Sequence, residues 1–241
     1  MASKDCRFTI GYTYYNEPEL LQQQLNLWKH YPHQVEIILV DDGSEEFPAY
    51  DIVKDFDYPN FQLWRVDEDL GFNSHGCRNL IADLANCDTI LFSDIDCHFS
   101  PETIAFLKRV SFNPERLYYF SFYSSASFEY HPWPGHPNVF AINKDKFWEA
   151  GGYDESFTGW HHGDREFIER LKVVTERSKI SDHLGFTLVR GARKCEVDAR
   201  VDKTTYDDVT MVIKMPTNMP PEAELKGTVK EKINFSYSRL L

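Results

Sequence analysis

Two short apolar runs, each followed at once by acidic residues, constrain this sequence more than any other feature. VEIILV at 35–40 is followed by Asp-Asp-Gly-Ser at 41–44, and DTILF at 88–92 leads into SDID at 93–96. An apolar run of this length, bounded by turn residues, is typical of a strand buried on both faces of a parallel sheet. The carboxyl ends of parallel strands meet at one edge, where ligands bind. We therefore expect the acidic residues to gather at one ligand-binding edge.

The rest of the first ~110 residues alternates between strand and helix patterns. RFTIGYTYY and NFQLWRV predict strands, the first at about 7–13, while Leu20, Leu21, Leu25 and Trp28 recur at helical spacing. Asn16 is a candidate N-cap for that helix. This alternation predicts an α/β fold with a mainly parallel sheet flanked by helices. Further helices are expected in HGCRNLIADLAN and in PETIAFLKRV, which has Pro101 and Glu102 in its first turn.

Composition narrows the protein class. The chain has 241 residues, of which 42% are hydrophobic, so we expect one large domain, or a domain with an appendage, around a sizeable core. The net charge of -12 does not favour nucleic acid as a partner, although a local basic patch would still allow it. No run approaches the ~18–20 apolar residues of a membrane span, and the N-terminus lacks a signal-peptide pattern. We expect a soluble cytoplasmic protein.

The five cysteines are odd in number and show no CxxC spacing. We therefore expect neither a disulfide framework nor a structural zinc site, and we expect a reducing compartment. The residues are Cys6, Cys77, Cys87, Cys97 and Cys195.

The Asp94–Asp96 pair has three readings. Carboxylate oxygens are hard ligands for Mg²⁺ or Mn²⁺, and His98 is an extra ligand if Mn²⁺ is used. The same pair serves as nucleophile and acid in phosphatases of the haloacid dehalogenase type. A polar strand end without chemistry is the third reading, because a DxD occurs by chance in many chains.

Three other clusters also have a functional and a structural reading. Asp41 and Asp42 are suited to accept hydrogen bonds from a ribose or a base, or they form an ordinary Asp-Gly turn. Arg78 is suited to a phosphate, or it is a surface arginine. Asp164 and Glu166 open a predicted helix, where the helix dipole favours acids; the functional alternative is a general base.

Together these pieces resemble an inverting GT-A glycosyltransferase of the family 2 type. TYYNEPELL is similar to that family's first-strand motif, VDDGS to its second-strand motif, HGCRN to its helix motif and SDID to its metal-binding DxD. GGYDESF followed by GDREF is similar to its acceptor-side motif. The resemblance covers about residues 7–175, with all five motifs in the family's order.

The resemblance implies a role for each matching residue. Asp164 is the expected catalytic base, and Glu166 is expected near the acceptor. Asp96 is expected to hold Mn²⁺ or Mg²⁺, with Asp94 at the ribose or the metal. Donor-binding roles are expected for Thr13, Tyr15, Asp41, Asp42, Arg78 and Asp94.

The sequence departs from the family pattern at several positions. Gly163 stands where the family usually has Glu, and His75 and Cys77 replace commoner small residues. His183 is our candidate for a late histidine that completes the metal shell in some relatives, with His161 and His162 as alternatives. Trp133 and Trp160 are candidate platforms for an acceptor sugar, since sugar faces pack well on aromatic rings.

The expected reaction is a metal-dependent, inverting transfer of a sugar from a nucleotide-diphosphate donor, first of all a UDP-sugar, to an acceptor hydroxyl on a glycan. The alternatives are the phosphatase that uses Asp94 and Asp96, and a non-catalytic sugar- or nucleotide-binding module of the same fold. A sugar nucleotidyltransferase would need a Gly-rich basic loop, which TYYNEPE lacks. We expect a nucleotide-sugar-binding half at 1–110, an acceptor and catalytic-base half at 111–200, and a C-terminal extension at 201–241.

Overall fold

The computed structural model describes residues 6–131, 136–158, 163–181, 184–189 and 233–241. Its centre is a large sheet with the strand order β10-β6-β9-β4-β1-β2-β3-β12. The inner strands β4, β1, β2 and β3 run parallel to one another, as the apolar runs predict, whereas β9 and β12 are antiparallel to their neighbours. The strands are β1 (Phe8–Tyr14), β2 (Val35–Asp41), β3 (Phe61–Val66), β4 (Thr89–Asp94), β6 (Arg116–Tyr119), β9 (Phe140–Asn143), β10 (Glu176–Lys179) and β12 (Tyr237–Arg239).

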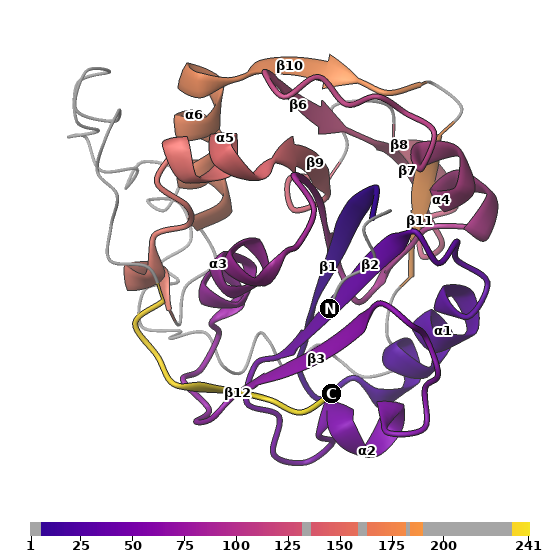
Figure 1. The fold of residues 1–241 in the computed structure, drawn as a ribbon, viewed down its shortest axis with the longest axis vertical. Helices are drawn as coiled ribbons and strands as arrows, with labels where there is room; N and C mark the ends of the chain where they lie inside the picture. The colour runs from indigo at the N-terminus through magenta and orange to yellow at the C-terminus, as the bar shows by residue number, and fades with distance from the viewer. Residues whose placement is uncertain (1–5, 132–135, 159–162, 182–183, 190–232) are drawn as a thin grey trace.

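Helices cover both faces of this sheet (Figure 1). Ile37 and Leu39 of β2 pack in one hydrophobic cluster with α1 and α2, while Ile38 and Val40 pack in a second cluster with α3. Side chains alternate between the faces of a strand, so a strand with two buried faces needs an uninterrupted apolar run. The helical segments are α1 (Pro18–Trp28), α2 (Ala49–Val53), α3 (Ser74–Leu84), α4 (Pro101–Leu107), α5 (Lys144–Glu149), η1 (Glu155–Phe157) and α6 (Gly163–Val174).

A smaller four-stranded sheet lies beside the large one, in the order β5-β11-β7-β8. The chain enters it directly after the DxD, because β5 follows Asp96. Its strands are β5 (Cys97–His98), β7 (Ser121–Ser124), β8 (Glu129–His131) and β11 (Gly185–Leu188).

The C-terminal residues return to the large sheet. β12 forms the edge of the sheet and pairs with β3, and the backbone amides of Ile233 and Asn234 donate to the Glu155 carboxylate at 3.1 and 2.8 Å. The weak periodicity of this part of the sequence did not predict a strand. Within the described residues, no helix is long and apolar enough to cross a membrane.

Two local expectations are wrong. Cys6 and Cys87 form a disulfide, although the odd cysteine count suggested that the cysteines are unpaired. The count therefore gives no support to a reducing compartment. Asn16 does not cap α1, whose N-cap is Glu17. Instead, Asn16 adopts a φ of 48°, and its side chain accepts a hydrogen bond from the Phe47 amide at 2.9 Å, which ties the loop after β1 to the loop after β2.

Candidate active site

The acidic clusters meet at one edge of the large sheet, as the sequence predicts. Thr13 of β1 is the register partner of Asp94 in β4, and Tyr14 is the partner of Asp41 in β2. Three of the predicted site residues, Thr13, Asp41 and Asp94, therefore lie at the carboxyl ends of adjacent strands. This is the edge at which parallel α/β sheets bind ligands.

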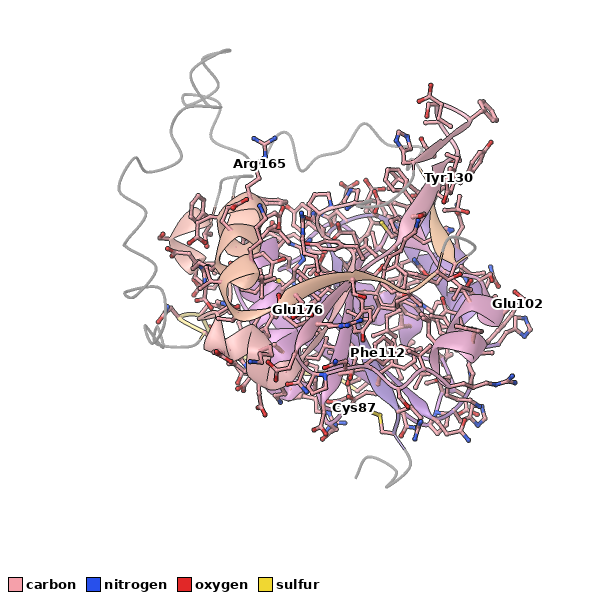
Figure 2. The ribbon with its side chains drawn as sticks, turned by 90° about the horizontal axis from the view of Figure 1, so that it is seen from above. Cys87, Glu102, Phe112, Tyr130, Arg165 and Glu176 are labelled. Carbon is pink, nitrogen blue, oxygen red and sulfur yellow. A yellow bond between two sulfur atoms is a disulfide. The ribbon has the colours of Figure 1, made fainter. Side chains whose placement is uncertain are left out.

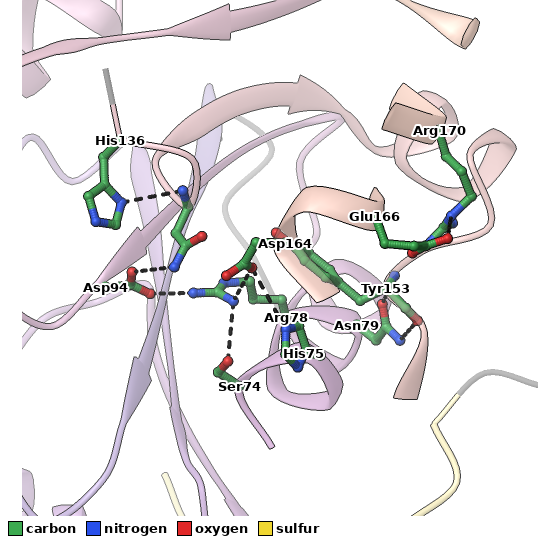
Figure 3. Close-up of polar contacts among 11 residues, drawn as sticks. Ser74, His75, Arg78, Asn79, Asp94, His136, Tyr153, Asp164, Glu166 and Arg170 are labelled. Atoms are coloured by element: carbon green, nitrogen blue, oxygen red, sulfur yellow. Dashed lines mark hydrogen bonds and ion pairs between the residues drawn. The ribbon is translucent and has the colours of Figure 1, made fainter. Parts of the chain in front are cut away.

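Arg78 is the centre of the polar network at this edge (Figure 3). It comes from α3, is 2% exposed, and donates to Asp94 Oδ1 at 2.5 Å and to Asp164 Oδ1 at 3.1 Å. Its Nη1 also reaches Ser74 Oγ at 3.3 Å, and its guanidinium lies over the Tyr153 ring. Burial opposes the charge, but the two carboxylates raise the pKa of Arg78, so the guanidinium stays charged. One buried cation thus joins the end of β4 to the start of α6.

Asp94 has a partner for each of its carboxylate oxygens. Oδ1 accepts from Arg78, and Oδ2 accepts from Asn138 Nδ2 at 3.2 Å. The backbone N–H of Asn138 in turn donates a hydrogen bond to His136 Nδ1 at 3.3 Å. Burial alone would raise the pKa of Asp94, but the Arg78 charge lowers it below its usual value. Asp94 is therefore an anion held in a fixed orientation.

Asp96 differs from Asp94 in its electrostatic environment. Burial, and the nearby negative charge of Asp94, raise the pKa of Asp96 to about 7. Potential ligand atoms of Asp94, Asp96 and Cys97 lie within 4.8 Å of one another. Two carboxylates this close are disfavoured as anions unless a cation lies between them, so this pair fits a divalent ion. Burial raises the pKa of the Cys97 thiol well above its usual value, which leaves the carboxylates as the hard ligands.

Asp164 faces the same network from the first turn of α6. Burial raises its pKa to about 6, although the Arg78 charge works in the opposite direction. The His75 Nε2 atom lies 3.9 Å from Asp164 Oδ1. A carboxylate with this pKa is largely ionised at neutral pH, and it is a stronger base than an exposed aspartate.

Gly163 lets α6 begin this close to α3. A Cβ atom at this position would lie 2.6 Å from His75 Nε2, well inside van der Waals contact. The two departures from the family pattern, Gly163 and His75, therefore belong together, because the imidazole fills the space that a side chain at 163 would need.

Glu166 is engaged by Arg170 of the same helix. The Arg170 Nε and Nη2 atoms donate to the two Glu166 oxygens at 2.6 Å each, and Nη1 donates to the carbonyls of Ala150 and Gly152. This pair fixes the turn of the GGYDESF segment against α6. An acceptor contact by Glu166 stays a prediction.

The remaining donor-side candidates bind the loops to one another. Asp41 is fully buried and accepts the backbone amides of Ser44 and Ala49 at 2.8 Å each, while Asp42 accepts the Asn73 amide at 3.0 Å. The Tyr15 hydroxyl donates to Asp69 Oδ2 at 2.8 Å.

Between Asp42 and Ser44, Gly43 has a φ of 73°, and a Cβ there would lie 2.9 Å from the Glu68 carbonyl. Only glycine fits this turn without strain. The donor contacts of this loop stay predictions.

Five predicted residues, Trp133, Trp160, His161, His162 and His183, lie outside the described residues. His98 lines a cavity on the small sheet, and it is not part of the acidic cluster of Asp94, Asp96 and Cys97. Sequence reasoning missed Asn138 and His136, because neither belongs to a motif and both follow a Pro-rich stretch. Their only signal is their place directly ahead of the short apolar run VFAI at 139–142.

A family model described as Glycosyl transferase family 2 matches residues 9–167. A comparison with curated protein sequences gave no match.

Several solved structures share the fold. S. aureus TarS superposes with a TM-score of 0.63 at 15% identity, covering 76% of this chain and 37% of that one. TarS 1-349 in complex with UDP-GlcNAc superposes with a TM-score of 0.65 at 14% identity, and the match covers 78% of this chain and 60% of that one. The mannosyltransferase PcManGT from Pyrobaculum calidifontis, in complex with GDP-Man and Mn²⁺, superposes with a TM-score of 0.59 at 15% identity. This match covers 80% of this chain and 59% of that one. The chain thus spans little more than a third of the first TarS chain, and these identities show similarity of fold alone.

Proposed function

Because the chain belongs to glycosyl transferase family 2, we propose that it transfers a sugar from a nucleotide diphosphate to an acceptor hydroxyl. The observation that carries this proposal is the buried network in which Arg78 joins Asp94 of the DxD to Asp164 of the acceptor-side motif. Such a network places a donor-side carboxylate and a candidate base around one cation. UDP is the first donor nucleotide to test, since TarS 1-349 is described in complex with UDP-GlcNAc.

Asp164 is the proposed general base. It accepts the proton of the acceptor hydroxyl as the oxygen attacks the anomeric carbon from the face opposite the diphosphate. The bond to the diphosphate breaks in the same displacement, so the anomeric configuration inverts. Burial raises the pKa of Asp164 to about 6, which brings it closer to the working pH than an exposed aspartate would be.

Asp96 and Asp94 are the proposed holders of a divalent cation, Mn²⁺ or Mg²⁺. When bound, such an ion supplies positive charge for a leaving diphosphate. Asp94 is already fixed by Arg78 and Asn138, whereas burial and the negative charge of Asp94 raise the pKa of Asp96, so a cation beside it would favour its ionised form. The residues of this chain therefore fit the ion that the family implies.

The phosphatase alternative requires Asp94 to act as a nucleophile. Here one of its oxygens is paired with Arg78 and the other accepts from Asn138. A carboxylate engaged at both oxygens is a poor attacking group, so the network favours the transfer reaction. A sugar-binding module without activity would bind metal and nucleotide but show no turnover. Changing Asp164 would therefore alter no measured rate.

Thermal stability against nucleotides tests the donor site. We expect UDP with Mn²⁺ to raise the melting temperature of the wild type, because a ligand at 100 times its Kd stabilises the native state by about 2.7 kcal/mol. At about 2–4 °C per kcal/mol, the shift is readily measured by scanning fluorimetry. Asp96→Ala should abolish it, whereas Asp83→Ala, at an exposed position of α3, should retain it. GDP and dTDP in parallel identify the base, and a wild type that responds to no nucleotide would contradict the proposal.

The pH dependence of turnover tests the base. Below the Asp164 pKa of about 6, kcat/KM should fall about tenfold per pH unit, because the protonated carboxyl accepts no proton. Above that pH, the rate should level off. UDP release from a UDP-sugar at saturating Mn²⁺ gives the profile, with circular dichroism at each pH as the control for folding. A rate that stays constant well below pH 6 would exclude Asp164 as the base.

A further inference from the structure

A cavity lies on the small sheet, and none of its lining residues belongs to the Arg78 network. It has a volume of about 480 Å³, within the ~300–1,000 Å³ of pockets that hold small ligands. Its walls come from the end of α1, the start of α4 and the strands β5, β7, β8 and β11. In Figure 2, Tyr130 of β8 and Glu102 of α4 lie on one side of the molecule, and Arg165 of α6 lies toward the other.

One row of side chains crosses the small sheet along this cavity. His98 in β5 is the register partner of Thr187 in β11, Thr187 is the partner of Tyr123 in β7, and Tyr123 is the partner of Tyr130 in β8. Register partners on neighbouring strands point to the same face. All four residues line the cavity. The two tyrosines, 40% and 56% exposed, thus stand beside each other as an aromatic platform at its open end.

The cavity offers hydrogen-bonding groups at its floor. Ser121, two residues before Tyr123 and therefore on the same face, is 1% exposed, and its hydroxyl has no hydrogen-bond partner among the described residues. The Nε2 atom of His98 is likewise buried without a partner. A buried polar atom without a partner costs stability, which a ligand hydroxyl would restore. Ser100, Thr103 and Thr187 add further hydroxyls to the lining.

The described residues of the lining include no acid and no strong base. Of the described residues around the cavity, none is Asp, Glu, Lys or Arg, although 27% of the chain is. None of these lining residues would compensate the charge of a phosphate, a carboxylate or an ammonium group. Aromatic faces next to neutral hydroxyl and imidazole groups match a ligand that has apolar C–H faces and many hydroxyls. An uncharged sugar ring has that chemistry.

The sheet separates this cavity from the Asp94 site by one layer of rings. Phe122 and Phe186 contact the His136 ring, with centroids 6.0 and 6.4 Å apart. His136 is joined to Asp94 through Asn138. The cavity is therefore a neighbour of the candidate active site but shares none of its carboxylates.

We propose that the row His98–Thr187–Tyr123–Tyr130 and the cavity beside it bind a neutral saccharide unit outside the site of sugar transfer. A further role, holding a distant unit of the acceptor glycan, rests on the proposed function. The saccharide packs a ring face on Tyr123 and Tyr130 and places hydroxyls at Ser121 and His98.

Calorimetric titration with maltotriose, cellotriose and tri-N-acetylchitotriose, in the absence of nucleotide, tests the site. We expect one of these trisaccharides to bind the wild type, and Tyr123→Ala or Tyr130→Ala to weaken it about 5- to 10-fold. Tyr50→Ala is the matched control, because Tyr50 in α2 is 41% exposed and does not line the cavity. Ser121→Ala should weaken binding without lowering the melting temperature, since the hydroxyl has no partner among the described residues.

Each outcome separates this site from the donor site. Binding by none of the three sugars, or binding that the Tyr123 and Tyr130 variants leave unchanged, would overturn the saccharide site. Stronger binding of the anionic trigalacturonic acid would overturn its neutral character. The UDP and Mn²⁺ thermal shift should be the same in Tyr123→Ala as in wild type. A wild type that binds none of the sugars but keeps its nucleotide shift refutes this proposal alone, and a wild type that binds sugar but shows no nucleotide shift refutes the transfer reaction alone.

Discussion

Replacing Asp164 with asparagine should lower turnover about 100- to 10,000-fold and leave donor binding intact. This is the range that a general base contributes. Asparagine has the shape of aspartate and keeps an oxygen for Arg78 Nη1, which lies 3.1 Å from Asp164 Oδ1. It accepts no proton from the acceptor. The loss should therefore appear in kcat, measured as UDP release with an active acceptor, while the thermal shift with UDP and Mn²⁺ remains.

Glu169→Gln is the matched control for this experiment. Glu169 is an acid on the same helix, but it pairs with Lys172 at the surface. Its replacement should change neither kcat nor the thermal shift. An Asp164→Asn protein that turns over like the Glu169→Gln protein would show that another group takes the proton.

Replacing Arg78 with methionine should lower the free energy of unfolding by about 3 kcal/mol at neutral pH. Removing one partner of a buried ion pair typically costs about 3–5 kcal/mol, because it leaves a buried charge uncompensated. The lower end applies here, since the side chains of Asp94 and Asp164 are 21% and 15% exposed. Urea unfolding of both proteins measures the difference.

The loss of unfolding free energy in Arg78→Met should be smaller at acid pH. Arg78 now lowers the pKa of Asp94 and opposes the rise in the pKa of Asp164. Without Arg78 both pKa values rise, so both carboxyls take up protons at higher pH and lose their repulsion as the pH falls. For the same reason, the fall in kcat/KM should move to higher pH in any activity that remains.

Arg116→Met is the control for the loss of an arginine. Arg116 is 45% exposed and lies 3.8 Å from Glu176, and an exposed pair of this kind contributes at most about 1 kcal/mol. If Arg78→Met and Arg116→Met unfold at the same urea concentration at neutral pH, the buried network does not stabilise the fold.

The inner sheet was predictable because its signal is local. A strand buried on both faces requires a nearly continuous apolar run, and VEIILV and DTILF are short runs of this kind, each followed by polar residues. The positions of Asp41 and Asp94 at one edge follow from parallel pairing alone. β12 had no such signal, since an edge strand of three residues is stabilised by its pairing with β3 and not by its own pattern.

The polar network was predictable only in part. The motifs named Arg78, Asp94 and Asp164, but each motif was read as a contact to a ligand. In the structure the three residues contact one another. Asn138 and His136, which complete the surroundings of Asp94, come from a loop far along the chain. No spacing rule connects that loop to the DxD.

The sequence by itself determined the α/β class, the order of the inner elements along the chain and the edge at which the acids gather. The reason is that buried strands and amphipathic helices each have a pattern formed by residues close together in the chain. Tertiary structure alone decided the rest. It paired Cys6 with Cys87, set Gly163 against His75, and turned His98 toward a cavity of its own. These contacts depend on residues that are far apart in the chain, or on the face of a strand to which a side chain points. Their energies depend on distances between atoms that only the folded chain sets.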